Sequence, residues 1–299
     1  MKSKWKMNPI LRKELMVGSR SIKMSLAIMA INGFLTLIVI LVMLVSAGTS
    51  GLASYDYSSL IYLFLVLGCI ECGIISLVVP IITSGSISGE REKQTLDIML
   101  TTPIKPFSIA VGKLESAMVV VMMYMISNIP MLAISFVLGG LSWWALLGLI
   151  GMMLYLGIYV GSVGIFCSSV VKRSVAATIL TIVIGIGIIT ITALIFGVWN
   201  GLATYLGVLK HGTNYNYEMG ASLMVMMMNP YAPIFDFMVR TLSSFSVYTM
   251  WDSMGNGNML LKGIYKGWIP ISMIVNLAVS FGFLKLAARN IAATRNRKR

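Results

Sequence analysis

"AATILTIVIGIGIITITALIFGVW", residues 176–199, carries no charged side chain over a length that is sufficient to cross a lipid bilayer. A transmembrane helix needs about 20 consecutive apolar residues. The same character extends through the chain of 299 residues, of which 58% are hydrophobic and 11% charged, with a mean hydropathy of +0.88. Soluble domains carry about 25% charged residues. The sequence therefore predicts an integral membrane protein.

Five further apolar runs of similar length flank this one. A segment in lipid must satisfy its own backbone hydrogen bonds, and these runs lack the alternation of barrel strands, so we expect transmembrane α-helices. The first run is not expected to be a cleaved signal peptide, because it is too long and follows a polar segment. The chain is thus predicted to form a single all-α membrane domain over residues 1–299. The six expected spans are residues 24–47, 60–83, 107–138, 143–171, 176–199 and 268–286.

The distribution of Lys and Arg predicts the orientation of these spans. Cytoplasmic ends of transmembrane helices are enriched in Lys and Arg. One side of the expected topology holds nineteen of them and the other holds four, all within residues 200–267. Both termini are therefore expected in the cytoplasm of a multi-pass protein of the cell membrane. The formal net charge of +13 is read as this topology signal plus attraction to anionic lipid, and not as a nucleic-acid site.

Two segments outside the spans have expected structures of their own. Residues 1–23 mix basic and apolar side chains, which favours an amphipathic helix at the inner interface, with a disordered basic tail as the alternative. Residues 200–267 form an extracytoplasmic insertion whose apolar pieces are interrupted by prolines. We expect two short helices there, with Asp236 and Arg240 paired at i, i+4. The alternative is that these pieces are two further spans.

A pair of glycines in the fourth run predicts close helix packing. Gly157 and Gly161 are four residues apart, so they lie on one face of a helix, and small residues let a neighbouring helix approach closely.

The residues required for catalysis are scarce. The chain has one histidine and three cysteines, and it contains no P-loop pattern for a nucleotide. We expect no catalytic residue, no metal site and no cofactor bound by this chain. Glu71, near the middle of the second run, is the exception, because an intramembrane carboxylate is costly. It is either a functional acid or a neutral carboxyl bonded to a neighbouring helix, with Asn32 and Asn128 as candidate partners.

A mixed-charge patch, "SISGEREKQTLDIMLTTPIKP" at residues 86–106, lies between the second and third runs on the predicted cytoplasmic side. Good helix formers and an apolar stripe predict a short amphipathic coupling helix over 86–103, and Pro103 disfavours a helical conformation in the residue before it.

The stretch "ISGEREKQTLDIMLTTPIKPFSIAVGKL" resembles the cytoplasmic segment of ABC-2-type ABC transporter permeases. That family has a Glu-Arg-Glu stretch, a Thr-Leu-acid run, a Thr-Pro pair and a Gly-Lys-Leu that opens the third span. Gln94 stands where the family often has Gly, and we expect Gln94 to suit a helix there. The matching residues are Glu90, Arg91, Glu92, Thr95, Leu96, Asp97, Leu100, Thr102, Pro103, Gly112, Lys113 and Leu114.

The resemblance implies a permease subunit of an ATP-driven exporter. Residues 90–100 would contact a separate ATP-binding subunit, which would hold ATP and Mg²⁺, and a second, identical or related permease would complete the translocation path. Two other functions stay open. An ion-coupled secondary transporter would use Glu71, and a non-transporting subunit of a sensor or resistance complex would share the partner helix.

Overall fold

The computed structural model of the chain describes residues 22–50, 57–95, 105–139, 142–211, 220–242, 264 and 266–296. These ranges are mostly helical, with short turns between some of the helices, and contain no strand. Six of the helices are long and apolar enough to cross a membrane, which confirms the expected all-α fold and its six spans. Of the interfacial helix expected over residues 1–23, residues 1–21 lie outside the described residues. The helices are α2 (Ile22–Ser50), α3 (Tyr57–Glu92), α5 (Pro106–Gly139), α6 (Trp143–Val170), α7 (Ser174–His211), α8 (Gly220–Met226), α9 (Ala232–Leu242) and α12 (Trp268–Asn296).

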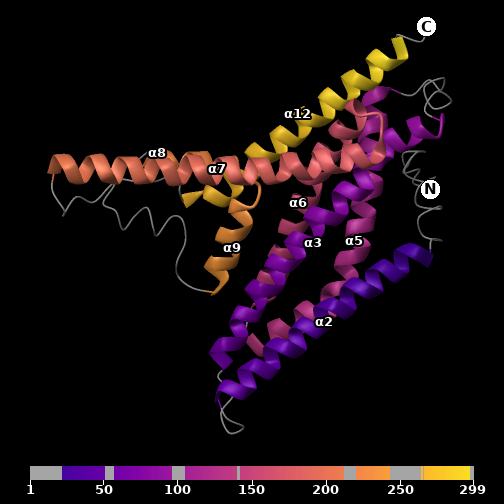
Figure 1. Cartoon of the computed structure of the whole chain (residues 1–299). Coiled ribbons are helices and arrows are strands. Elements are labelled where there is room, and N and C mark those ends of the chain that lie inside the picture. Colours follow the sequence, from indigo (N-terminus) through magenta and orange to yellow (C-terminus); the bar gives the residue numbers. More distant parts are fainter. Residues whose placement is uncertain are drawn as a thin grey trace, which may run out of the picture. The chain divides into compact units, whose positions relative to one another are not determined.

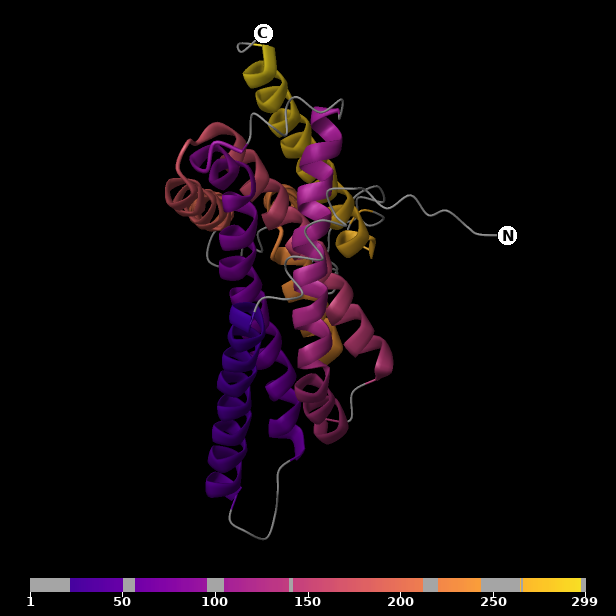
Figure 2. The same cartoon turned by 90° about the vertical axis from the view of Figure 1, so that its right-hand side faces the viewer.

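The chain divides into two compact units, of which the first comprises Met1–Ile182 and Ser280–Arg299. Within this unit α3 packs most extensively against α6 and α5, and α2 contacts both α3 and α5. These four helices lie side by side (Figures 1 and 2). The first turns of α7 and the last turns of α12 complete the unit.

Small residues on α6 allow the close approach of α3 and α5. A Cβ atom added to Gly161 would lie 2.7 Å from Leu114 Cδ1 of α5, and one added to Gly164 would lie 2.0 Å from Thr83 Oγ1 of α3. At Gly157 the corresponding distance to Met118 Cε is 3.1 Å. The predicted packing surface is confirmed, and Gly164 extends it by one turn.

A hydrophobic cluster lies in this unit beside the last turns of α3. It joins four helices of the bundle, and partly buried side chains such as Phe166 pack against it. Burial of apolar area is the main favourable contribution to such a contact. The cluster therefore packs the last turns of α3 against α5, α6 and α12. Its buried members are Ile87, Ala110, Leu114, Ile165, Leu284, Ala287 and Ile291.

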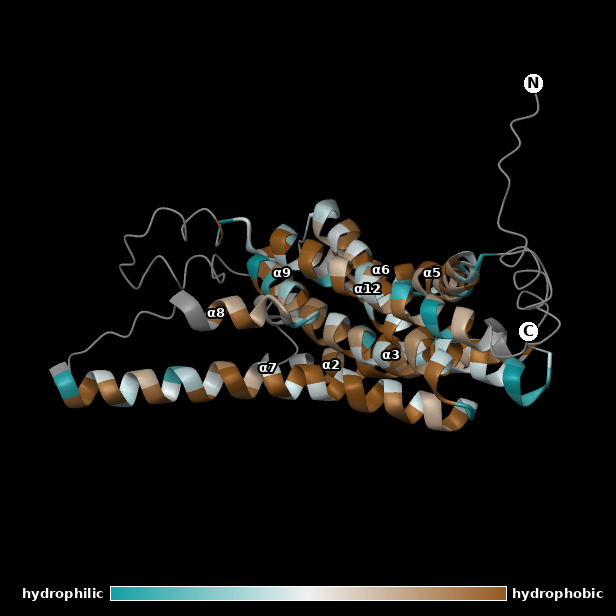
Figure 3. Ribbon diagram, turned by 90° about the horizontal axis from the view of Figure 1, so that it is seen from above, coloured by the Kyte–Doolittle hydropathy of each residue, from teal (hydrophilic) through white to brown (hydrophobic). Residues whose placement is uncertain are grey.

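The second unit, Val183–Val279, holds the rest of α7, the first turns of α12, and the two short helices α8 and α9. With 7 and 11 residues, α8 and α9 are too short to span a bilayer, which removes the alternative of two further spans in residues 220–242. Helix α7 continues beyond the expected end of its span to His211, and Figure 3 shows hydrophobic colouring along most of it.

Asn229 shapes the turn between the two short helices. Its Oδ1 accepts a hydrogen bond from the N–H of Tyr231, and its Nδ2 donates to Thr192 Oγ1 of α7 at 3.0 Å. The expected pair between Asp236 and Arg240 is present, with 2.9 Å between Arg240 Nη2 and Asp236 Oδ2. The prediction of two short helices in this segment is confirmed.

Candidate functional site

The charged patch begins as the last turn of α3. The sequence predicted a separate amphipathic helix over residues 86–103, but α3 runs without interruption through Glu92. The N–H of Thr95 donates to the carbonyl of Glu90 at 2.9 Å, and that of Gln94 donates to the carbonyl of Arg91 at 3.1 Å. This pair of bonds is the Schellman arrangement that closes a helix C-terminus. The charged residues therefore end α3.

The backbone conformation of Gln94 differs from the one expected from the sequence. It adopts a φ of 58°, and no other residue besides glycine in the described ranges has positive φ. The left-handed conformation is costly for a residue with a Cβ atom and is where glycine is favoured. Gln94 was expected to suit a helix, but it occupies the position just past a helix end, where the family's usual glycine fits better.

Glu90 forms an ion pair with α5. The Nζ of Lys113 lies 2.6 Å from Glu90 Oε1, and the two side chains are 6% and 23% exposed. A buried ammonium group requires a partner, since its desolvation is expensive. The structure thus brings together two residues that the sequence nominated 23 positions apart.

Arg91 reaches the C-terminal end of α6. Its guanidinium donates to the carbonyl of Ser169 at 3.3 Å and to that of Val171 at 3.5 Å. The last carbonyls of a helix have no partner within the helix, and the dipole there favours a cation. Arg91 therefore compensates the end of α6, with bonds that are long and individually weak.

Glu92 caps the N-terminus of α7. Its Oε1 accepts a hydrogen bond from the backbone N–H of Ser174 at 2.9 Å, and its Oε2 accepts one from Ser174 Oγ at 2.7 Å. The first N–H groups of a helix lack partners within it, and a negative charge there is favoured by the helix dipole. The carboxylate of α3 therefore performs the role that a local N-cap side chain usually performs.

Glu90 and Arg91 are half-buried against the chain's own helices, whereas Glu92, Lys93, Gln94 and Thr95 are exposed, with the carboxylate of Glu92 on Ser174. Gly112 is buried near the start of α5, as is Lys113, so neither presents a surface to a partner directly. The remaining nominated residues, namely Leu96, Asp97, Leu100, Thr102 and Pro103, lie outside the described residues.

Sequence reasoning missed the partners of this network. Ser169 and Ser174 flank the basic pair Lys172-Arg173, and a serine that follows a short polar link is a usual signal for a helix start. That signal identifies where α7 begins, but it does not indicate that the capping group comes from α3.

Glu71 is buried in α3, with 1% of its surface exposed. Neither of its carboxylate oxygens has a hydrogen-bond partner among the described residues. Tyr124 of α5 is close enough to interact electrostatically with Glu71. The amide of Asn128, also on α5, is buried without a hydrogen bond of ordinary geometry to any described residue. The expected bonds from Glu71 to Asn32 or Asn128 are absent from the described part of the chain.

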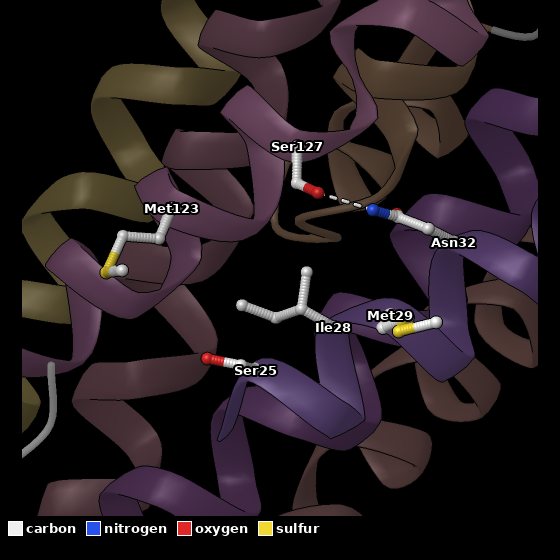
Figure 4. Close-up of a pocket in the computed structure, with 6 residues that line it drawn as sticks. All are labelled: Ser25, Ile28, Met29, Asn32, Met123 and Ser127. Carbon is white, nitrogen blue, oxygen red and sulfur yellow. Dashed lines mark hydrogen bonds between the residues drawn. The ribbon is translucent and has the colours of Figure 1, made fainter. Parts of the chain in front are cut away.

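Asn32 instead lines a cavity of about 410 Å³ between α2 and α5. Its Nδ2 donates to Ser127 Oγ, as Figure 4 shows. Ser25, Ile28, Met29 and Met123 complete the lining, which thus mixes polar and apolar side chains. The cavity is a feature of the contact between the first and third spans.

The fold and the charged end of α3 define the class of protein. It is an α-helical multi-pass membrane protein in which a polar network joins the end of α3 to α5, α6 and α7. The chain belongs to the ABC-2 transporter family, since the family model described as ABC-2 family transporter protein matches residues 72–282, well over half of the sequence. Members of this family are membrane permease subunits of ABC transporters. A search of curated proteins gave no match.

Proposed function

We propose that this chain is the permease subunit of an ATP-driven exporter in the cell membrane, with both termini in the cytoplasm. A separate ATP-binding subunit supplies ATP and Mg²⁺, and a second permease completes the path. The observation that carries the proposal is the exposed turn Lys93–Gln94–Thr95, which ends α3 within the matched region, on the side that is rich in Lys and Arg.

The exposed turn offers the ATP-binding subunit a rigid contact. Behind it, Glu90, Arg91 and Glu92 bond to α5, α6 and α7. When the ATP-binding subunits close on ATP, displacement of this turn moves the ends of the spans together. The spans then exchange an inward-facing for an outward-facing arrangement, a two-state equilibrium that nucleotide binding biases.

The test is co-purification in mild detergent with a charge-reversed turn. We compare the native chain with Lys93→Glu, and with Lys266→Glu as a matched control, because both lysines are exposed and the second lies in the other compact unit. A P-loop ATPase is expected to co-purify with the native chain and with Lys266→Glu, and to be reduced with Lys93→Glu. Absence of any ATPase from the native sample would overturn the proposal.

The burial of Glu71 without a hydrogen-bond partner favours a second candidate, an ion-coupled transporter. In that case transport into sealed vesicles responds to the proton gradient in the absence of ATP, and Glu71→Gln abolishes the response. Transport that requires ATP and persists after the gradient is collapsed excludes this second candidate.

A further inference from the structure

We propose that Glu92 is a positioning residue that clamps the first turn of α7 to the partner-facing end of α3, so that displacement of the exposed turn moves the fifth span. The inference rests on the proposed function and deepens it. It assigns to one carboxylate the step between contact with the ATP-binding subunit and movement of α7.

The geometry of the clamp is that of a two-point bond. Both carboxylate oxygens of Glu92 are engaged by Ser174, one by the backbone N–H at 2.9 Å and one by Oγ at 2.7 Å. Glu92 directly precedes the exposed turn that begins at Lys93. No flexible segment therefore separates the surface that a partner meets from the start of α7.

A second polar bond joins the same two helices one turn further along α7. The hydroxyls of Ser84 and Thr178 lie 2.5 Å apart. Apart from these bonds α3 and α7 share little contact, in contrast to the extensive packing of α3 on α5 and α6. The link between α3 and α7 is therefore carried by polar groups, which form and break at defined distances, and not by a packed apolar interface.

The start of α7 has no capping group of its own. The residue before Ser174 is Arg173, whose side chain has no acceptor atom for the free N–H groups of a helix N-terminus. An ionised carboxylate at this position also interacts favourably with the helix dipole. The first turn of α7 consequently depends on a residue of α3, so a shift of α3 either moves that turn or uncaps it.

The test separates a clamp from an ordinary cap. The native permease–ATPase complex in lipid nanodiscs is compared with Glu92→Ala, with Glu92→Ala combined with Arg173→Ser, and with Arg173→Ser alone. Serine at 173 supplies a local cap without a bond to α3. Glu115→Ala, on an exposed glutamate of α5, is the matched control. Amide hydrogen exchange of residues 174–182 is measured with and without a non-hydrolysable ATP analogue.

We expect the analogue to change exchange in this segment in the native complex and in Glu115→Ala. Glu92→Ala speeds basal exchange there by about 2- to 30-fold, the range that corresponds to loss of a helix cap. The combined variant recovers basal protection, yet the response to the analogue stays lost. Glu92→Gln, which keeps the shape of the side chain, serves if the alanine variant does not fold, and it is expected to weaken the response.

The outcomes of this experiment separate a clamp from an ordinary helix cap. If the combined variant regains the response, or if Glu92→Ala never loses it, Glu92 is only a cap and the inference is overturned while the proposed function stands. If no ATPase accompanies the native permease, the proposed function fails and the inference fails with it.

Discussion

The carboxylate of Glu90 is the partner that makes the buried position of Lys113 tolerable. Removal of one member of a buried pair leaves an uncompensated charge, at a cost of about 3–5 kcal/mol. We therefore expect Glu90→Ala to lower the unfolding temperature of the detergent-solubilised protein strongly, and the double variant Glu90→Ala/Lys113→Met to recover most of the loss. Glu115→Ala, at an exposed position, is the control. A double variant as unstable as the single one would contradict the assigned pairing.

The left-handed conformation of Gln94 leads to a second expectation at the residue scale. Relief of the steric cost of a Cβ atom there is worth about 1 kcal/mol, so Gln94→Gly is expected to raise the unfolding temperature. The neighbouring Lys93→Gly is expected to lower it, because a glycine there loosens the end of the helix without relieving strain. Equal effects of the two substitutions would show that the position past the end of α3 is not strained.

For substitution of Glu71 we expect the opposite effect on thermal stability from that expected for Glu90. The carboxyl of Glu71 is buried without a hydrogen bond among the described residues, so no hydrogen bond compensates the free-energy cost of its desolvation. Glu71→Gln is therefore expected to leave thermal stability unchanged or to raise it. A clear loss of stability would reveal a structural partner. Gain of stability with loss of transport would assign the residue a functional role.

At the scale of the element, the existence of each span was predictable while the end of α3 was not. A long apolar run must become a helix in lipid, and that requirement is local to the run. The end of α3 depends on bonds with residues that are distant in the sequence, among them Ser169 and Ser174. Good helix formers after Glu92 favoured continuation, but the backbone turns at Gln94.

The glycine face of α6 allows a test at the same scale. A Cβ atom at Gly164 would overlap Thr83 Oγ1, whereas one at Gly151 would meet nothing within 4 Å. We expect Gly164→Ala to destabilise the bundle by about 1–3 kcal/mol, as overpacking does, and Gly151→Ala to be neutral. Thr83→Ala in the Gly164→Ala background removes the overlapping oxygen and is expected to recover part of the loss. Unfolding in a denaturant series measures each difference.

For the whole molecule, the sequence located the candidate site but did not reveal its internal bonds. The resemblance nominated Glu90, Arg91 and Glu92 as contacts for a partner. The structure shows that each bonds to a different helix of the same chain. No local sequence pattern predicts a hydrogen bond to a residue about 80 positions away, because charge and spacing indicate only which side chains share one helix face.

The network at the end of α3 also bears on how the chain is assembled during synthesis. The partners of Arg91 and Glu92 lie about 80 residues later in the chain, at Ser169, Val171 and Ser174. Consider a nascent chain whose second span has been inserted before residue 174 is synthesised. Its α3 helix is complete, but Arg91 and Glu92 at the end of that helix still lack their hydrogen-bond partners. The fourth and fifth spans must then return to it, which gives the ribosome-bound intermediate a defined point at which later spans register on earlier ones.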